Sequence, residues 1–126
     1  MDRLYKSFLP ILLAAFCSMT LAGQQPAKDL TIVNGNHWVA AELDEKRAYL
    51  FGVGNVLEIE QAMAGASFAA MRGRSIVPVL LNGHSGISIA DIVAMLDGFY
   101  ADHPDQTKRP VLEVLYLEMA LPRMTR

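Results

Sequence analysis

The clearest hydrophobic pattern in the chain lies between Ser88 and Pro104. Apolar residues recur there at the three- and four-residue spacing of one helix face, at Ile89, Ile92, Val93, Leu96, Phe99 and Tyr100. Ser88 precedes the pattern with Asp91 three residues later, which resembles a capping box, and His103-Pro104 follows it. The spacing therefore predicts an amphipathic helix that starts after Ser88 and ends at His103.

Three further helices are expected. Residues 37–71 contain no proline and are rich in strong helix formers, which predicts a short helix at 36–42 and a long one at about 44–70, with a kink or break near Gly65. Small side chains along the long helix should let a neighbouring helix come close, namely Ala48, Gly52, Ala62, Gly65, Ala66 and Ala69. Pro110 suits the first turn of a last, mostly apolar helix, which Pro122 should end. We expect this helix at the centre of the bundle.

The run Ile76–Leu81 is apolar and β-branched, and the turn Asn82-Gly83 follows it. It could form one isolated strand or a buried extended loop, and Pro78 in its middle favours the loop. Pairing with Leu30–Val33 would instead give a short β-ribbon. The sequence thus predicts an all-α fold, a compact bundle of about four helices with one irregular apolar connection.

The first 23 residues have the layout of a secretory signal peptide. Arg3 and Lys6 precede the mostly apolar stretch Phe8–Cys17, and small residues follow up to Gly23. We expect cleavage there, a flexible leader at 24–29 and a single helical domain at 30–126. An uncleaved signal would instead tether the domain to the inner membrane, whereas Gln24 stands where a lipid anchor would need a cysteine.

Composition narrows the classes of function. Removing residues 1–23 leaves 103 of the 126 residues, which suits one domain. Cys17 is the only cysteine and leaves with the signal peptide, so the exported domain has neither a disulfide nor a thiolate ligand. The mature part carries nine basic and twelve acidic residues, a net charge of −3. This balance argues against nucleic acid as a partner, because phosphate binding needs a basic face. No stable membrane insertion is expected after cleavage.

Motifs of known chemistry are incomplete. Gly83–Ile87 is similar to the G-x-S-x-G nucleophile elbow, but an isoleucine replaces the second glycine and the chain is too short for the required sheet. Gly52-Val53-Gly54 lacks the third glycine of a dinucleotide fingerprint, so close helix packing is the simpler interpretation. His37, His84 and His103 have no i, i+4 relation that would suit a metal. We therefore expect no enzyme activity, no cofactor and no metal.

The aromatic residues and the end of the 89–102 helix have structural interpretations. Trp38 with Tyr49, Phe51, Phe99 and Tyr100 could form a partner-binding patch, although core packing is favoured for such large side chains in a small domain. Asp102-His103-Pro104-Asp105 is typical of a polar helix end, where His103 can face the terminal carbonyls.

Two stretches resemble a known family. Asn34–Trp38 and the residues after it are similar to an N-G-x-x-W…K-x-x-Y-[VL]-x-G pattern, and Leu96–Pro104 with Pro110-Val111 is similar to L-D-x-F-Y-x-x-x-P…P-V. The motif positions are Trp38, Lys46, Tyr49, Gly52, Asp97, Phe99, Tyr100, Pro104 and Pro110. Over most of residues 34–119 the chain resembles the Rap/Tai immunity proteins of type VI secretion.

The resemblance implies a compact all-α domain in the periplasm. Members of the immunity branch bind and block a cell-wall amidase toxin, and they are similar to one another in carrying a disulfide, which the mature part of this chain lacks. The resemblance thus implies a periplasmic protein, such as a cell-wall amidase, as the partner.

Three functional hypotheses follow. The first is a non-enzymatic interaction protein, immunity- or inhibitor-like, that uses the loop at 82–86 or the turn at 102–109. Its candidate partner-binding residues are Asn82, His84, Ser85, Asp102, His103 and Asp105. The second is a ligand-binding helical bundle in which the alanine- and glycine-rich long helix leaves an apolar cavity for a small molecule. The third is a small metal-dependent hydrolase that uses His84, Ser85 and His103.

Overall fold

The computed structural model describes residues 31–125, so the signal peptide and leader expected over 1–29 lie outside the described residues. The α-helices are α1 (Gly35–Ala40), α2 (Leu43–Ala64), α3 (Val77–Gly83), α4 (Ile89–Asp102), α5 (Val111–Val114) and α6 (Leu121–Met124). Two 3₁₀ segments, η1 (Gly65–Met71) and η2 (Pro104–Gln106), and one π-helical segment, η3 (Leu115–Ala120), join them. Within residues 31–125 β-pairing is limited to isolated bridges. The predicted all-α bundle is confirmed.

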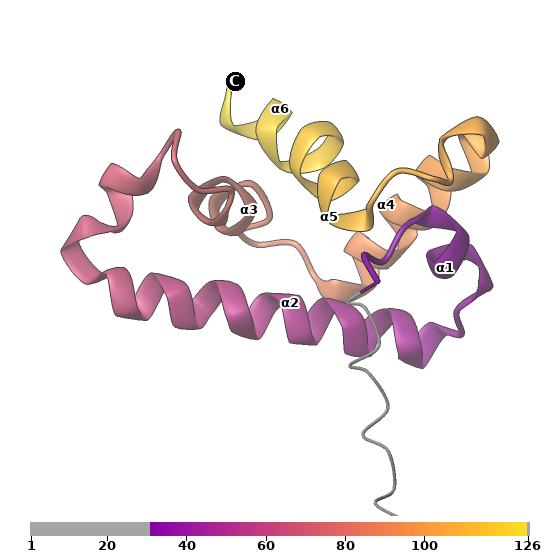
Figure 1. Cartoon of the computed structure of the whole chain (residues 1–126), viewed down its shortest axis with the longest axis horizontal. Helices are drawn as coiled ribbons and strands as arrows, with labels where there is room; N and C mark the ends of the chain where they lie inside the picture. Colours follow the sequence, from indigo (N-terminus) through magenta and orange to yellow (C-terminus); the bar gives the residue numbers. More distant parts are fainter. Residues whose placement is uncertain (1–30, 126) are drawn as a thin grey trace, which may run out of the picture. The chain divides into compact units, whose positions relative to one another are not determined.

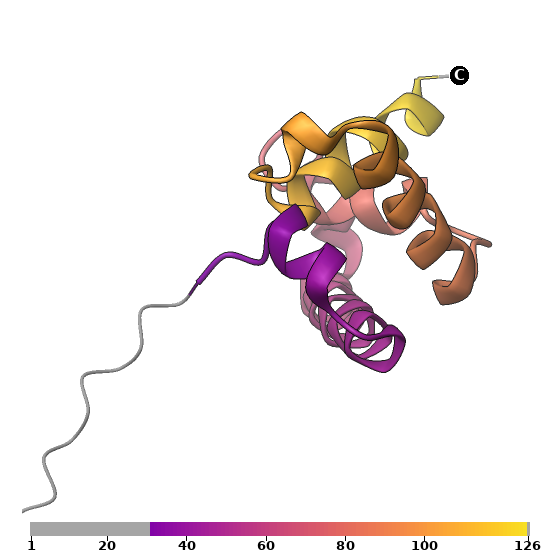
Figure 2. The same cartoon turned by 90° about the vertical axis from the view of Figure 1, so that its right-hand side faces the viewer.

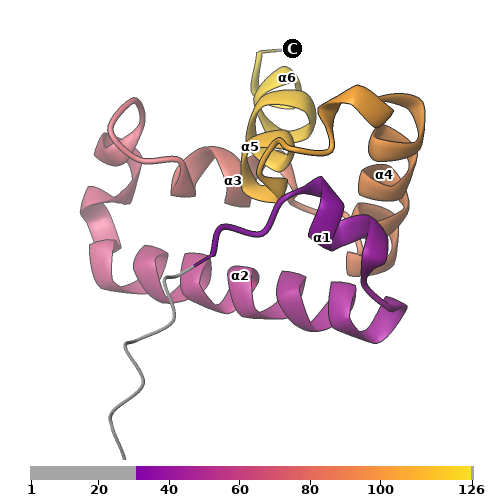
Figure 3. The same cartoon turned by 45° about the vertical axis from the view of Figure 1, so that its right-hand side comes forward.

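Helix α2 runs along one edge of the bundle, and the other helices gather on one side of it (Figure 1). Figure 2, which looks nearly along α2, shows the same arrangement end-on. Both α3 and α4 pack against α2, and α3 also packs against η3 and α6. Helix α1 lies near the beginning of α2 and contacts α4 (Figure 3). The opposite side of α2 is left uncovered by these helices.

The core follows the predicted helix faces where periodicity was strong. The buried apolar residues are Trp38, Leu50, Leu80, Val93, Leu96, Tyr100, Val111, Val114, Leu115, Met119 and Ala120. The buried positions of α4 belong to the apolar face expected from its spacing, and its N-cap is Ser88, whose hydroxyl accepts from the Asp91 backbone N–H. The last helix lies at the centre, as predicted, because most of its residues from 111 to 120 are buried or half-buried.

The apolar run at 76–81 is neither a strand nor an extended loop, so both predictions were wrong. Residues from Val77 onward form α3, and Pro78 lies in its first turn, where the missing N–H would have no partner within the helix. The β-ribbon prediction was also wrong, because the Val33 carbonyl accepts from Val111 N–H at 2.9 Å instead.

Pro122 does not end the last helix, contrary to the sequence prediction. It lies in the first turn of α6, directly after the π-helical segment η3. A proline inside a regular α-helix clashes with the carbonyl four residues earlier, and a π-helical turn widens the backbone spacing at that point. The chain therefore continues as a helix to Met124.

The expected close approach of small residues along α2 is also corrected. A Cβ placed on Gly52 or Gly54 would meet no described atom within 4 Å, so neither glycine serves helix packing. The close contact is at Gly83 instead, where a Cβ would lie 2.5 Å from the Cα of Ala120. The break expected near Gly65 is confirmed, because α2 ends there with Gly65 at φ +50°, a conformation that favours glycine.

The start of the described chain is joined through the backbone to the segment between α4 and α5. Gly35 N–H donates to the carbonyl of Arg109 at 3.1 Å, and Asn36 N–H donates to that of Thr107 at 2.9 Å. The Tyr100 hydroxyl donates to the same Arg109 carbonyl, and burial raises the pKa of this phenol to about 12. Residues 33–36 and 107–111, which we call the terminal clasp, thus hold α1 against the end of α4.

Candidate functional site

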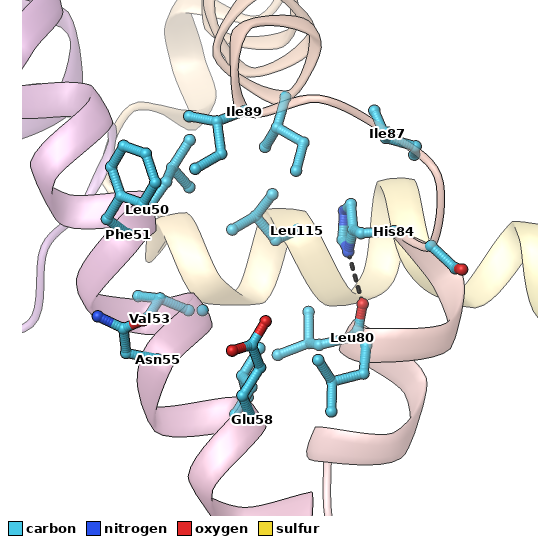
Figure 4. Close-up of a pocket in the computed structure, with 15 residues that line it drawn as sticks. Leu50, Phe51, Val53, Asn55, Glu58, Leu80, His84, Ile87, Ile89 and Leu115 are labelled. Atoms are coloured by element: carbon cyan, nitrogen blue, oxygen red, sulfur yellow. Dashed lines mark hydrogen bonds between the residues drawn. The ribbon is translucent and has the colours of Figure 1, made fainter.

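A cavity of about 430 Å³ lies between α2, α3, the start of α4 and η3 (Figure 4). Its apolar lining residues are Leu50, Phe51, Val53, Leu57, Leu80, Leu81, Ile87, Ile89, Ile92 and Leu115. The remaining lining residues are Gly54, Asn55, Glu58, His84 and Ser85. Cavities of this size and apolar character are typical of sites for small organic molecules.

The turn after α3 forms one wall of the cavity. Helix α3 ends at Gly83, and Gly86 takes a positive φ of 77°, which glycine adopts at low cost and which turns the chain toward α4. Ile87 and Ile89 then line the cavity from beyond the turn, with Ile89 beside Phe51 of α2 and Ile87 on the side of His84 (Figure 4). The predicted interaction loop at 82–86 is therefore positioned by the packing of α3 and α4 and contributes His84 and Ser85 to the lining.

His84 is held in one orientation by its own helix. Its Nδ1 lies 2.9 Å from the Leu80 carbonyl, which only accepts, so Nδ1 carries the proton and Nε2 has the lone pair. Within residues 31–125, Nε2 is buried and has no hydrogen-bond partner. Burial lowers the pKa of this imidazole, and the positive charge of Arg123 lowers it further. The hydrogen bond to Leu80 raises the pKa but only partly offsets these two effects. His84 is therefore kept neutral.

We expect this histidine to make stability depend on pH. Because its pKa in the folded protein lies below the ordinary value of 6.5, the unfolded chain binds more protons, and stability should fall as the pH drops below about 6.5. In His84→Asn, the amide nitrogen takes the position of Nδ1 and can still donate to Leu80, but it does not titrate. Thermal unfolding between pH 7.5 and 5 should therefore show a shallower decline of Tm for the variant. Parallel declines would contradict the depressed pKa.

The polar part of the lining is small and carries one sign of charge. Among the described residues, Glu58 is the charged group in the lining, accompanied by Asn55 and Ser85. Figure 4 shows the Glu58 carboxylate reaching from α2 toward the space in front of Leu115. No salt bridge within residues 31–125 involves this carboxylate. The cavity therefore offers an unpaired negative group beside an apolar surface.

The other predicted partner-binding residues lie elsewhere. Asn82 is exposed in α3 but does not line the cavity, and Asp102 and Asp105 are exposed around the end of α4. His103 directs Nδ1 to the Phe99 carbonyl at 2.9 Å, which confirms the interpretation of a histidine at a helix end. Its ring also stacks on Phe99 with centroids 4.7 Å apart. The two predicted loops thus do not form one site.

The motif residues of the first half of the chain meet those of the second half in one cluster. Trp38 Nε1 donates to an oxygen of Asp97 at 2.8 Å, and Lys46 Nζ donates to the same oxygen at 2.9 Å. The Lys46 ammonium lies 5.6 Å from the Trp38 ring centre, and Tyr49 meets the ring edge-on. The cluster ties α1 and α2 to α4. The role is structural, as expected for these aromatic side chains.

The other motif positions also lie in the framework of the fold. Phe99 packs edge-on against Tyr100 with ring centroids 5.3 Å apart, Pro104 begins η2, and Pro110 is the N-cap of α5 and bridges to Asn34. Gly52 differs from them, because it is exposed on α2.

The outer side of α2 carries an apolar surface that the sequence reading did not single out. Its large residues are Val56, Ile59 and Met63, which are exposed by 66%, 59% and 80% and which we call the α2 outer row. Phe51, exposed by 59%, lies at the border between this row and the cavity. No charged residue occurs between Arg47 and Glu58 in the sequence. The core interpretation was wrong for Phe51, because that ring lies at the edge of the cavity and in solvent. An uncharged stretch on an otherwise charged helix was the available signal.

Neither a metal-binding cluster nor a membrane-spanning helix is found among the described residues. Within residues 31–125, no group of three His, Cys, Asp or Glu side chains is arranged to hold a metal ion. In the same part of the chain no helix combines the length and the apolar character needed to cross a membrane.

Comparison of the chain with protein-family models, curated proteins and solved structures finds no significant match.

Proposed function

We propose that this protein is an exported, non-enzymatic binding domain that recognises another protein through the α2 outer row. The observation that carries the proposal is the exposure of three large apolar side chains along one side of a 22-residue helix, with exposed Phe51 at the border of that side. Contiguous apolar surface of this kind is typical of interaction sites, because exposing it to water is unfavourable. Burying the row against a partner would remove that cost.

The form of the row favours a helix or groove of a partner protein. Val56, Ile59 and Met63 follow the three- and four-residue spacing of one helix side, and exposed Gly52 lies between them and Phe51. This is the arrangement used when an apolar helix side packs into a groove. A membrane surface fits less well, because α2 carries Glu58 and Glu60 and no basic residue after Arg47.

The identity of the partner comes from the resemblance to the Rap/Tai immunity proteins. An immunity- or inhibitor-like role in the periplasm predicts a cell-wall amidase as the protein that covers α2. The loop at 82–86 places His84 and Ser85 in the lining of the cavity, to which Val56, Ile59 and Met63 do not contribute, so this loop is not part of the proposed contact. In the turn at 102–109, Thr107 and Arg109 belong to the terminal clasp and support the fold.

A charge introduced into the α2 outer row tests this proposal. We expect Ile59→Glu to weaken partner binding at least tenfold, because a carboxylate would have to leave water in the interface. Gln61→Glu is the matched control, since it adds the same charge at an exposed position of the same helix outside the row. Circular dichroism should be unchanged for both variants, because both positions are exposed.

The measurement is affinity capture from a periplasmic extract followed by quantitation of the recovered protein. The wild type and Gln61→Glu should retain one stoichiometric partner, and Ile59→Glu should lose it. Recovery of a peptidoglycan amidase would support the inhibitor role. Retention of the partner by Ile59→Glu would overturn the α2 outer row as the contact surface.

A further inference from the structure

We propose that the cavity between α2, α3 and the start of α4 is a binding site for a small molecule with an apolar body and a positively charged head, of the aliphatic amine class. This proposal does not depend on the α2 outer row, because Val56, Ile59 and Met63 do not line the cavity.

The size and lining of the cavity fit a small apolar body. Its volume of about 430 Å³ lies within the range of roughly 300–1,000 Å³ typical of small-molecule sites. Buried Leu80 and Leu115 contribute to its lining, and half-buried Leu57 adds to the wall from α2. A flexible hydrocarbon chain would replace water along these side chains, which is favourable in proportion to the area that it covers.

The charge of the lining selects the head group. Glu58 is the charged residue among the described lining residues, and neither a lysine nor an arginine lines the cavity. Arg123 of α6 acts electrostatically on His84 but does not line the cavity. An ammonium group beside the Glu58 carboxylate would form a charge-assisted hydrogen bond, whereas a carboxylate head would be repelled. The oxygen atoms of Asn55 and Ser85 can accept further N–H bonds.

Gly54 gives a way to fill the cavity without breaking the fold. It lines the cavity, and a Cβ there would meet no described atom within 4 Å. A leucine at this position would therefore extend into the space that the ligand needs. Gly52 has the same open surroundings on the same helix but does not line the cavity, so Gly52→Leu is the matched control for the change in helix propensity.

The test is isothermal titration of the purified protein with decylamine, decanol and decanoate, each below its micelle concentration at pH 7. We expect decylamine to bind most tightly and decanoate most weakly. Gly54→Leu should weaken decylamine binding at least tenfold, while Gly52→Leu should leave it unchanged. Glu58→Gln should weaken decylamine binding about threefold, as for an ion pair near the surface, and should not weaken decanol binding.

The outcomes separate this proposal from the proposed function. Decanoate binding as tightly as decylamine would overturn the charged-head assignment, and unchanged decylamine binding to Gly54→Leu would overturn the cavity as the site. Failure to bind any of the three probes would also overturn it. Ile59→Glu should keep wild-type decylamine binding even where it loses the protein partner, and Gly54→Leu should remain folded by thermal unfolding.

Discussion

Replacing Gly83 with alanine should destabilise the domain by about 3 kcal/mol, which would lower Tm by roughly 15 °C for a domain of this size. A Cβ at this position would lie 2.5 Å from Cα and 2.7 Å from the carbonyl oxygen of Ala120, which are backbone atoms of a buried helix. Since the backbone of η3 cannot rotate away as a flexible side chain would, α3 must shift as a whole. Chemical denaturation of Gly83→Ala measures the loss.

Gly52→Ala is the control for this substitution. A methyl group there meets no described atom within 4 Å, and alanine is the better helix former by about 1 kcal/mol. The control should therefore be slightly more stable than the wild type. If Gly83→Ala were as stable as the wild type, the close packing of α3 on η3 would be incorrect.

Truncating Trp38 to alanine should cost about 4 kcal/mol, the range found when a large buried aromatic is removed. The side chain is 1% exposed and is the largest residue in the core. Its loss would open a cavity between α1, α2 and α4 and would remove the hydrogen bond to Asp97. The Asp97 carboxylate would keep Lys46 and would stay partly in water, so it adds little to the cost.

Two other substitutions provide comparisons for the loss of stability in Trp38→Ala. Trp38→Phe should cost about 1–2 kcal/mol, because it keeps most of the apolar volume and loses the Nε1 donor. Phe51→Ala should change stability by less than about 0.5 kcal/mol, because Phe51 is 59% exposed. Urea denaturation of the three variants measures these differences. Similar losses at Trp38 and Phe51 would contradict the assignment of one ring to the core and the other to the surface.

Much of the fold could be predicted where the periodicity of apolar residues coincides with burial. The spacing of apolar residues in α4 predicts its buried face correctly: Val93, Leu96 and Tyr100 all pack inward. Helix α3 could not be predicted in this way. A short, uninterrupted apolar run looks alike in a strand, a loop or a buried helix, and contacts with η3 and α6 decide among them. Similarly, Pro122 indicated a helix end, and only the π-helical turn before it shows why the helix continues.

The sequence predicts the candidate site less completely than it predicts the fold. The polarity of His84 and Ser85 beside apolar segments predicts them as candidate binding residues, and the structure places both at a cavity. The opposite wall comes from α2 and the floor from Leu115, and a one-dimensional pattern does not indicate contacts over such separations. The α2 outer row was missed for a related reason. Apolar residues on both sides of a helix predict burial, and here one side is uncovered.

The terminal clasp imposes an order on how this chain can fold. Helix α1 has six residues, too few to be stable by itself, and its first backbone N–H groups bond to residues near the far end of the domain. Closing so long a loop costs entropy before any contact compensates for it. During synthesis, α1 therefore stays unformed until the chain up to Val111 is available. Trp38 is then among the last residues to pack into the core.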